Sequence, residues 1–265
     1  CQIAVFLIVA GSCVAGTRWL DTQDYVVKLN LTRFFAETEQ GILPLLTLTY
    51  VPNLFDILPM YLVILMMMPL VILLGSLNRW YAFALVGGMW LLAQLALVQF
   101  GAEVRPGNDR EWFFNPFGWQ LVFFTGFAFM TGWIKAPPIR WWLVALALAV
   151  LAFNVVFASR FFWPHSDFVY GVRDLVWPAF EKTDQGIFRF THFLALAYLC
   201  YAAAGEGGRR LAGSGAWGAT VAVIRKVGQQ SLPIFLTGMV GAQAAGALLD
   251  VTGRDALSVA AVNLL

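Results

Sequence analysis

The sequence predicts an all-α fold, a polytopic bundle of transmembrane helices. Hydrophobic residues make up 60% of the chain, charged residues make up only 12%, and the mean hydropathy is +0.73. These values lie far outside the usual range of soluble domains. The apolar runs are continuous and lack the alternation of membrane β-strands, so helices are the structure that satisfies their backbone in hydrocarbon.

The chain contains about eight apolar segments, and most reach the roughly 17 to 25 residues that a membrane-spanning helix needs. They lie at residues 1–17, 54–75, 80–100, 116–134, 141–158, 190–205, 230–249 and 256–265. The sixth is short, and its helix is expected to begin one turn earlier. Because no soluble stretch of appreciable size is left over, residues 1–265 are expected to form a single integral membrane domain.

Basic residues gather in one alternate set of loops and acidic residues in the other. The basic set contains Arg79, Lys135, Arg140, Arg209, Arg210, Arg225 and Lys226. The acid-rich set consists of the longer loops 18–53, 101–115 and 159–189. Since cytoplasmic loops carry an excess of Lys and Arg, we expect the basic loops in the cytoplasm and the acid-rich loops outside. In the first outer loop we expect an amphipathic piece, a break at Gly41 and a short interfacial or re-entrant stretch.

Asp56 lies at the outer end of the second apolar segment. A carboxylate in a spanning helix is costly unless it faces protein or water, so Asp56 is a candidate catalytic residue. Asn53 lies about one helical turn earlier and is a candidate substrate-binding residue on a similar face. The alternative is that Asn53 caps the helix while Asp56 complements the helix dipole.

Asn115 and Pro116 predict a helix start, with Asn115 as the cap and Pro116 at the first helical position. Gln120 is expected to face inward one turn deeper. Asn115 and Gln120 could bind the hydroxyls of a sugar substrate, or they could hold two helices together. Trp119 could stack on a sugar ring, or it could belong to the aromatic belt at the membrane interface.

The stretch EKTDQGIFRFTHF leads into the sixth segment and carries several polar groups. His192 is a candidate catalytic residue, because a neutral imidazole can exchange a proton during acyl transfer and a carboxylate from another loop could orient it. Lys182, Asp184 and Arg189 are candidate substrate-binding residues. The alternative for His192 is a structural residue held by hydrogen bonds.

Motifs for several other functions are absent from the sequence. There is no P-loop, HExxH, G-x-S-x-G or paired-cysteine pattern, and no basic block of the kind that binds nucleic acid. We therefore expect no metal site, no tightly bound cofactor and no nucleic-acid partner, and cofactor-binding residues are unassigned. Membrane lipids are the expected surroundings of the helices.

Three stretches, TLTYVPNLFDILPMYLVIL, WFFNPFGWQLVFF and KTDQGIFRFTHFLALAYL, resemble in this order the OpgC family of bacterial membrane proteins. The resemblance spans nearly the whole chain. It implies a multi-pass protein of the bacterial inner membrane that succinylates osmoregulated periplasmic glucans and is related to the acyltransferase-3 superfamily. It also implies an acyl-CoA donor from the cytoplasm, succinyl-CoA, and a periplasmic glucan as acceptor, with the acid-rich loops periplasmic.

The resemblance also bears on the extent of the chain. Family members are thought to have about ten helices, each of spanning length, so the segments here would be the third to the tenth. Because Cys1 lies inside an apolar run and the last run is short, we expect a fragment truncated at both ends. The superfamily resemblance implies a catalytic histidine on the first helix, a role that no residue of this fragment inherits.

These features favour a membrane O-acyltransferase that moves an acyl group, succinyl by the resemblance, onto hydroxyls of periplasmic glucans. A base would deprotonate the sugar hydroxyl, and hydrogen-bond donors would hold the developing oxyanion. One alternative is a non-catalytic transporter or flippase of a polar lipid or glycan, whose polar residues would line a path. Another is a structural membrane subunit whose outer loops bind a partner.

Overall fold

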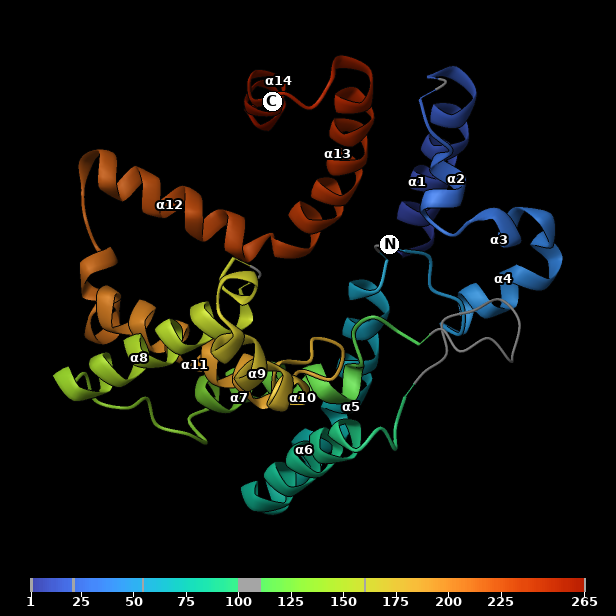
Figure 1. The fold of residues 1–265 in the computed structure, drawn as a ribbon. Helices are drawn as coiled ribbons and strands as arrows, with labels where there is room; N and C mark the ends of the chain where they lie inside the picture. The colour runs from blue at the N-terminus through green and yellow to red at the C-terminus, as the bar shows by residue number, and fades with distance from the viewer. Residues whose placement is uncertain (1, 21, 54, 100–110, 160, 265) are drawn as a thin grey trace. The chain divides into compact units, whose positions relative to one another are not determined.

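The computed structural model describes residues 2–20, 22–53, 55–99, 111–159 and 161–264 of the chain. Every regular element within these ranges is a helix, which confirms the all-α prediction (Figure 1). The chain divides into two compact units. The first combines residues 1–54 with 213–265, and the second holds residues 55–212.

The described residues of the second unit form five long helices and several short ones. The long helices are α5 (Ile57–Leu77), α6 (Arg79–Gln94), α7 (Pro116–Met130), α8 (Trp141–Ala158) and α11 (Ile187–Ala204). The short ones are the 3₁₀ turns η1 (Trp163–His165) and η2 (Glu206–Leu211) and the helices α9 (Asp167–Leu175) and α10 (Trp177–Phe180).

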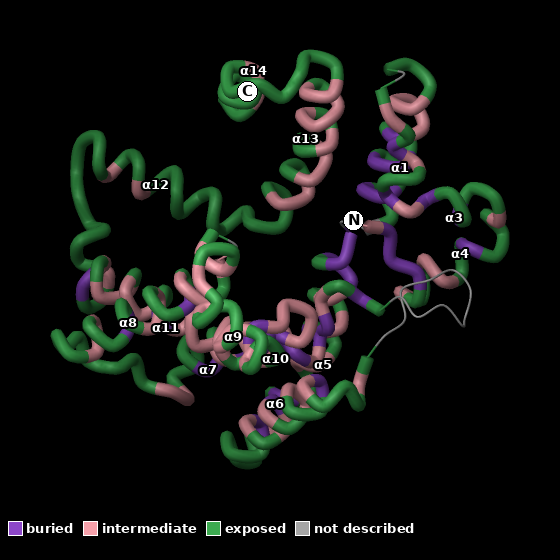
Figure 2. Tube along the Cα trace, viewed as in Figure 1, coloured by how far each residue is buried: buried purple, intermediate pink, exposed green. Residues whose placement is uncertain are grey.

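Helices α5, α6 and α7 pack on one another around a small apolar core. Its fully buried members are Ile64 and Val71 of α5, Ala82 and Val86 of α6, and Phe124 of α7. Figure 2 shows this concentration of buried positions on α5 and α6. Because the three helices share one core, they hold the start of α7 in a defined position.

Helices α8 and α11 form the other packed pair of this unit and run side by side (Figure 1). The side chain of Asn154, buried in α8, donates to the carbonyl of Val150 one turn earlier at 2.9 Å. An amide on an otherwise apolar helix is satisfied in this way by the helix's own backbone. The buried amide nitrogen of Asn154 therefore needs no partner from α11.

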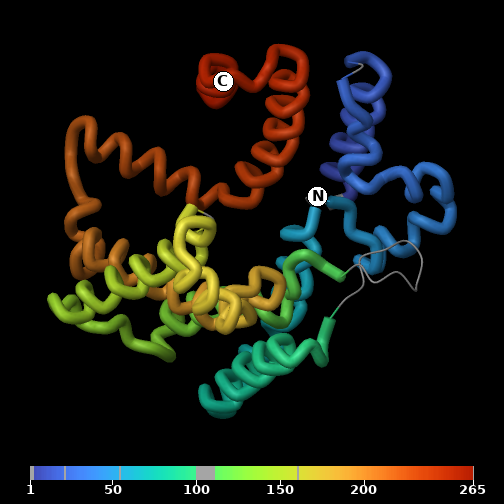
Figure 3. Tube along the Cα trace, viewed as in Figure 1, coloured from blue at the N-terminus to red at the C-terminus, as the bar shows by residue number. Residues whose placement is uncertain are grey.

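The first unit is built from both ends of the chain, which Figure 3 shows in blue and in orange to red. Its N-terminal helices are α1 (Gln2–Trp19), α2 (Tyr25–Lys28), α3 (Thr32–Ala36) and α4 (Thr38–Leu46), and its C-terminal helices are α12 (Gly215–Gln229), α13 (Ser231–Thr252) and α14 (Ala256–Asn263). Phe34 stacks on Tyr50 with ring centroids 5.9 Å apart and meets Phe6 of α1 edge to face at 5.0 Å. These rings form the centre of the N-terminal part.

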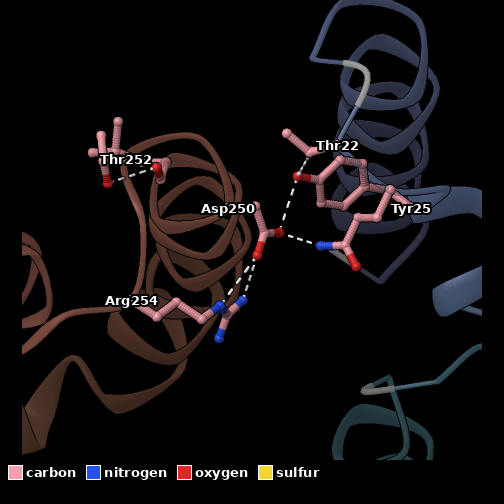
Figure 4. A network of polar contacts seen from close by, with 7 residues as sticks. Thr22, Tyr25, Asp250, Thr252 and Arg254 are labelled. Atoms are coloured by element: carbon pink, nitrogen blue, oxygen red, sulfur yellow. Dashed lines mark hydrogen bonds and ion pairs between the residues drawn. The ribbon is translucent and has the colours of Figure 1, made fainter.

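Asp250 joins the two ends of the chain within the first unit (Figure 4). Its carboxylate accepts hydrogen bonds from the Tyr25 hydroxyl at 3.0 Å and from the Gln23 amide. Arg254, one turn further along, donates to the other carboxylate oxygen at 2.6 Å. A carboxylate near the end of an apolar helix is thus paired with a cation and neutral donors, as such an acid requires.

A helix lies in each of the eight predicted segments, and α11 begins at Ile187, as expected from the short sixth segment. Two local predictions were wrong. Gly41 does not break the chain but lies inside α4, buried against the Phe34 ring, where a Cβ would approach a ring carbon to 2.8 Å. The predicted loop before the seventh segment contains α12, an exposed helix with Arg225 and Lys226 near its end.

Within the described ranges, four helices, α5, α8, α11 and α13, are long enough and apolar enough to cross a membrane. Helices α1 and α7 are apolar but shorter. Large apolar side chains on the spanning helices face outward, as Met66 of α5 does with 78% of its surface exposed. Outward-facing apolar residues along helices of bilayer length support a membrane protein.

Replacing Phe124 by Ala should lower the free energy of unfolding by about 3–5 kcal/mol, because it leaves a cavity in the core of α5, α6 and α7. The measurement is the thermal unfolding midpoint of the purified protein in detergent. Phe168→Ala is the matched control, since Phe168 is 72% exposed and should leave the midpoint nearly unchanged. An equal loss for both variants would contradict the assigned core.

Candidate functional site

The loop at residues 181–186 docks on the first turn of α7. The Trp119 indole N–H donates to the carbonyl of Lys182 at 3.0 Å, and the backbone N–H of Asn115 donates to the carbonyl of Thr183 at 2.9 Å. At Gly118 the two backbones come so close that a Cβ would lie 2.4 Å from the Asp184 carbonyl oxygen. Only glycine permits this approach.

Helix α6 holds the same loop from a second side. The Gln94 amide donates to the carbonyl of Asp184 at 2.5 Å, and the Trp90 indole N–H donates to the carbonyl of Gln185 at 3.0 Å. Gln185 is buried, and its φ of 55° lies in the left-handed region, which residues other than glycine rarely adopt. The contacts with Trp90 and Gln94 hold the loop in this unfavourable conformation. Sequence reasoning missed Trp90 and Gln94, although a glutamine inside an apolar segment is a usable signal.

Asn115 connects the docked loop to the helix start. Its side-chain oxygen accepts from the Phe117 N–H at 3.0 Å, which confirms the predicted cap, and Pro116 occupies the first turn as predicted. Its amide nitrogen donates to the carboxylate of Asp184 at 2.9 Å and to the carbonyl of Val98 at 2.7 Å. One buried side chain therefore caps α7 and orients a carboxylate.

The pKa of Asp184 is raised above its ordinary value of 3.8. Burial is the main cause, since it disfavours the charged form, and the negative charge of Glu181 adds to it. The hydrogen bond from Asn115 acts in the opposite direction because it stabilises the carboxylate. A carboxylate that is partly desolvated and held in place is suited to accept a proton.

A cation and an aromatic surface lie beside this carboxylate. The Lys182 ammonium lies over the rings of Phe113 and Phe114, 4.4 and 5.0 Å from their centroids. The Phe114 ring meets Trp119 edge to face at 5.0 Å. Asp56, buried just before α5, accepts a hydrogen bond from the Phe113 N–H at 3.4 Å. Asp56 therefore contacts the aromatic segment, and its predicted catalytic role stays a prediction.

We call Asn115, Trp119, Lys182 and Asp184, with the rings of Phe113 and Phe114, the loop–α7 cluster. The structure brings these four predicted site residues together, and Asp56 touches their aromatic border. The cluster combines a carboxylate, an ammonium and flat apolar surfaces. These are the groups with which proteins bind sugar rings and their hydroxyls.

Gln120 faces inward as predicted, but its contacts lie outside the cluster. Its side chain is fully buried, and its amide donates to the carbonyls of Val86 on α6 at 2.8 Å and of Phe117 at 3.0 Å. Its carbonyl oxygen, Oε1, is buried without a hydrogen-bond partner in the described part of the chain. Gln120 was predicted either to bind a sugar hydroxyl or to hold two helices together. The structure shows the second, a hydrogen bond from α7 to α6.

Arg189 and His192, the two site residues predicted at the start of the sixth segment, make no hydrogen bond to the loop–α7 cluster within the ranges that the structure describes. Arg189 donates through Nε to the carbonyl of Phe180 at 2.6 Å, so it ties α11 to the end of α10. His192 lies in the second turn of α11, and its Nδ1 is buried without a hydrogen-bond partner among the described residues. The expected orienting carboxylate is therefore not present at Nδ1 within that part of the chain.

Asn53 does not share a helical face with Asp56, because α5 begins only at Ile57. Asn53 belongs to the first unit, where its side chain donates to the carbonyl of Lys28 at 3.1 Å and its N–H donates to that of Leu29 at 3.1 Å. The alternative interpretation as a cap was also wrong, since α5 has no side-chain cap. The helical spacing assumed for these two residues applies only inside a helix.

The comparison with protein families is decisive for identity. The family model described as OpgC protein matches residues 1–265. This chain belongs to the OpgC family. No curated protein and no solved structure matches it.

Membership of the OpgC family associates this chain with the modification of osmoregulated periplasmic glucans and with a transferase role. The loop–α7 cluster is formed by two of the three stretches on which the family resemblance was recognised. In the described ranges no group of three His, Cys, Asp or Glu side chains is arranged to hold a metal ion. The loop–α7 cluster itself offers a carboxylate, an amide, an ammonium and aromatic rings.

Gly118→Ala should detach the docked loop, because the new Cβ would collide with the Asp184 carbonyl, a backbone atom that cannot rotate away. We expect faster hydrogen exchange in residues 181–186 and at the Asn115 amide, measured by mass spectrometry. Gly126→Ala on the same helix is the matched control, since a Cβ there has nothing within 4 Å. Unchanged exchange in the Gly118 variant would contradict the docking.

Proposed function

We propose that this OpgC-family chain forms the acceptor side of a membrane O-acyltransferase that transfers a succinyl group to hydroxyls of periplasmic glucans. The observation that carries the proposal is the pairing of Asp184 with Asn115 on the docked loop. The family supports the glucan and the transferase role, and the cluster supplies groups that fit a sugar hydroxyl.

Asp184 takes the proton of the acceptor hydroxyl in this proposal. The succinyl-CoA thioester reaches this periplasmic loop from its cytoplasmic source through the helices. The hydroxyl oxygen attacks its acyl carbonyl, the C–O ester bond forms and the C–S thioester bond breaks. The proton passes from the hydroxyl to Asp184 and finally to the leaving thiolate. The raised pKa of Asp184 makes its carboxylate a stronger base than an exposed aspartate, and the Asn115 bond keeps it aimed.

Lys182 and the aromatic rings bind the substrates. The ammonium, held over Phe113 and Phe114, offers a positive charge to the free carboxylate of a succinyl group. The Trp119 and Phe113 surfaces suit the apolar faces of glucose rings.

Arg189 and Asp56 act as positioning residues, since Arg189 holds the end of α10 and Asp56 holds the Phe113 segment. The donor is a substrate and is not held as a resident cofactor.

Expression of the full-length protein in a bacterial strain that lacks glucan acylation tests the proposal. We expect added succinyl mass on the purified periplasmic glucans, measured by mass spectrometry. Glucans without added acyl mass, from cells that contain the protein in the membrane, would contradict acyl transfer. Such a result would favour a transporter or a structural subunit.

Asp184→Asn should abolish the added mass while the protein level in the membrane is unchanged. Asparagine keeps an oxygen that can accept the Asn115 bond but cannot take up the proton. Asp174→Asn, on the exposed surface of α9, is the matched control and should acylate normally. If His192→Gln abolishes acylation and Asp184→Asn does not, His192 is the base instead.

The pH dependence of unfolding separates the role of Asp184 in catalysis from a role in stability. A carboxyl group whose pKa is raised by folding favours the folded state fully below its unfolded pKa, and this contribution is lost as pH rises through the folded pKa. Asp184→Asn should therefore unfold at an equal or higher temperature than the unmodified protein at neutral pH. The difference should shrink toward acid pH. A lower unfolding temperature at neutral pH would show that the carboxylate is structural.

A further inference from the structure

An apolar groove of about 510 Å³ lies between α8 and α11, within the second unit. Its walls are formed by Leu143, Leu146 and Val150 of α8 and by Leu194 and Tyr201 of α11, and Phe129, Ala136 and Pro137 border it. Its volume lies within the roughly 300–1,000 Å³ of small-molecule sites. The groove is separate from the loop–α7 cluster, since the two share no lining residue.

Two alanines create the space. Ala147 of α8 and Ala195 of α11 are both buried and both line the groove. Their short side chains leave room where larger residues on the same helices would fill it. The space between the two helices is therefore set by these positions.

Two polar groups of the lining, the hydroxyls of Thr191 and Tyr198, already have partners. The Thr191 hydroxyl donates to the carbonyl of Phe188 at 3.2 Å, and the Tyr198 hydroxyl donates to the carbonyl of Pro138 at 3.0 Å. A succinyl group or a sugar placed here would lose hydrogen bonds to water without gaining equivalent ones. The groove therefore fits a hydrocarbon chain and not the polar substrates of the proposed reaction.

One end of the groove is bordered by basic residues. Lys135 adjoins Ala136 of the lining, and the backbone N–H of Arg140 donates to the Tyr198 hydroxyl at 3.2 Å. At the end of α11, the Arg210 guanidinium donates to the carbonyls of Ala202 and Ala203 at 3.4 and 3.3 Å, beside Tyr201.

Lys135 and Arg140 are exposed, and the nearby segments 131–141 and 201–211 contain one acidic residue, Glu206. Trp141 and Trp142 follow directly and are exposed, as residues at a membrane interface are. The end of the groove is therefore positively charged at the depth where lipid headgroups lie.

We propose that the α8–α11 groove binds an acyl chain of an anionic phospholipid from the bilayer, with the headgroup phosphate at Lys135, Arg140 and Arg210. The apolar lining takes the chain, and the three cations take the phosphate. Basic sites between transmembrane helices bind anionic lipids by this combination of hydrocarbon burial and charge. The charged end of the groove borders the basic loops, which we expect in the cytoplasm. The bound lipid therefore belongs to the cytoplasmic leaflet.

Native mass spectrometry of the full-length protein with added dioleoyl phosphatidylglycerol or dioleoyl phosphatidylcholine tests the proposal. We expect one phosphatidylglycerol to bind at least about tenfold more tightly than phosphatidylcholine, because each basic residue adds to the attraction. Equal binding of the two lipids would overturn the charge-selective site. Binding of free glycerol phosphate as tight as that of the lipid would overturn the role of the groove.

Two independent variants localise the site. Ala147→Phe should fill the groove and remove the tight phosphatidylglycerol, whereas Ala145→Phe, at an exposed position of α8 outside the groove, should not. The double variant Lys135→Gln with Arg140→Gln alters only exposed side chains and should reduce the preference for phosphatidylglycerol about tenfold or more, while Arg225→Gln should leave it unchanged. Equal effects of a variant and its control would mean unspecific lipid around the helices and would overturn the proposal.

Discussion

The candidate site depends on the close approach of two backbones, that of Gly118 in the first turn of α7 and that of Asp184 in the docked loop. The absence of a Cβ at Gly118 lets the loop lie directly on the helix. Asn115 then reaches the Asp184 carboxylate while it caps the same helix. A larger residue at position 118 would push the loop away and separate the Asn115 amide from the Asp184 carboxylate. The lack of a side chain at one position therefore permits the hydrogen bond between two others.

Polar side chains in this apolar protein act mainly as connectors. Gln120 links α7 to α6, Gln94 links α6 to the docked loop, and Asp250 links α13 to Tyr25 of α2. In surroundings with little water, a buried polar group is costly unless it finds a partner, and backbone carbonyls are the most abundant partners. Polarity inside an apolar segment therefore predicts a contact more reliably than it predicts catalysis.

Much of the fold could be predicted because its signals are local. The length of each apolar segment places a helix, the pair Asn115 and Pro116 marks the start of α7, and the periodicity of α7 turns Gln120 inward. Two predictions failed because they depended on residues that come close only in the folded chain or on the exact start of a helix. Gly41 was expected to break the chain, yet the Phe34 ring against it makes glycine useful inside a helix. Asn53 was paired with Asp56 on a helix that starts only at Ile57.

The sequence by itself determined the all-α class, the positions of the long apolar helices and the family, because hydropathy, capping residues and motifs are properties of neighbouring residues. Only the tertiary structure decided which candidates meet. Asn115 and Asp184 are 69 residues apart, and Trp119 and Lys182 are 63 apart, so their contacts arise from the packing of α6, α7 and the docked loop. The same packing left Nδ1 of His192 without a hydrogen-bond partner among the described residues and opened the apolar groove beside α8. Such features depend on which faces of distant helices come together.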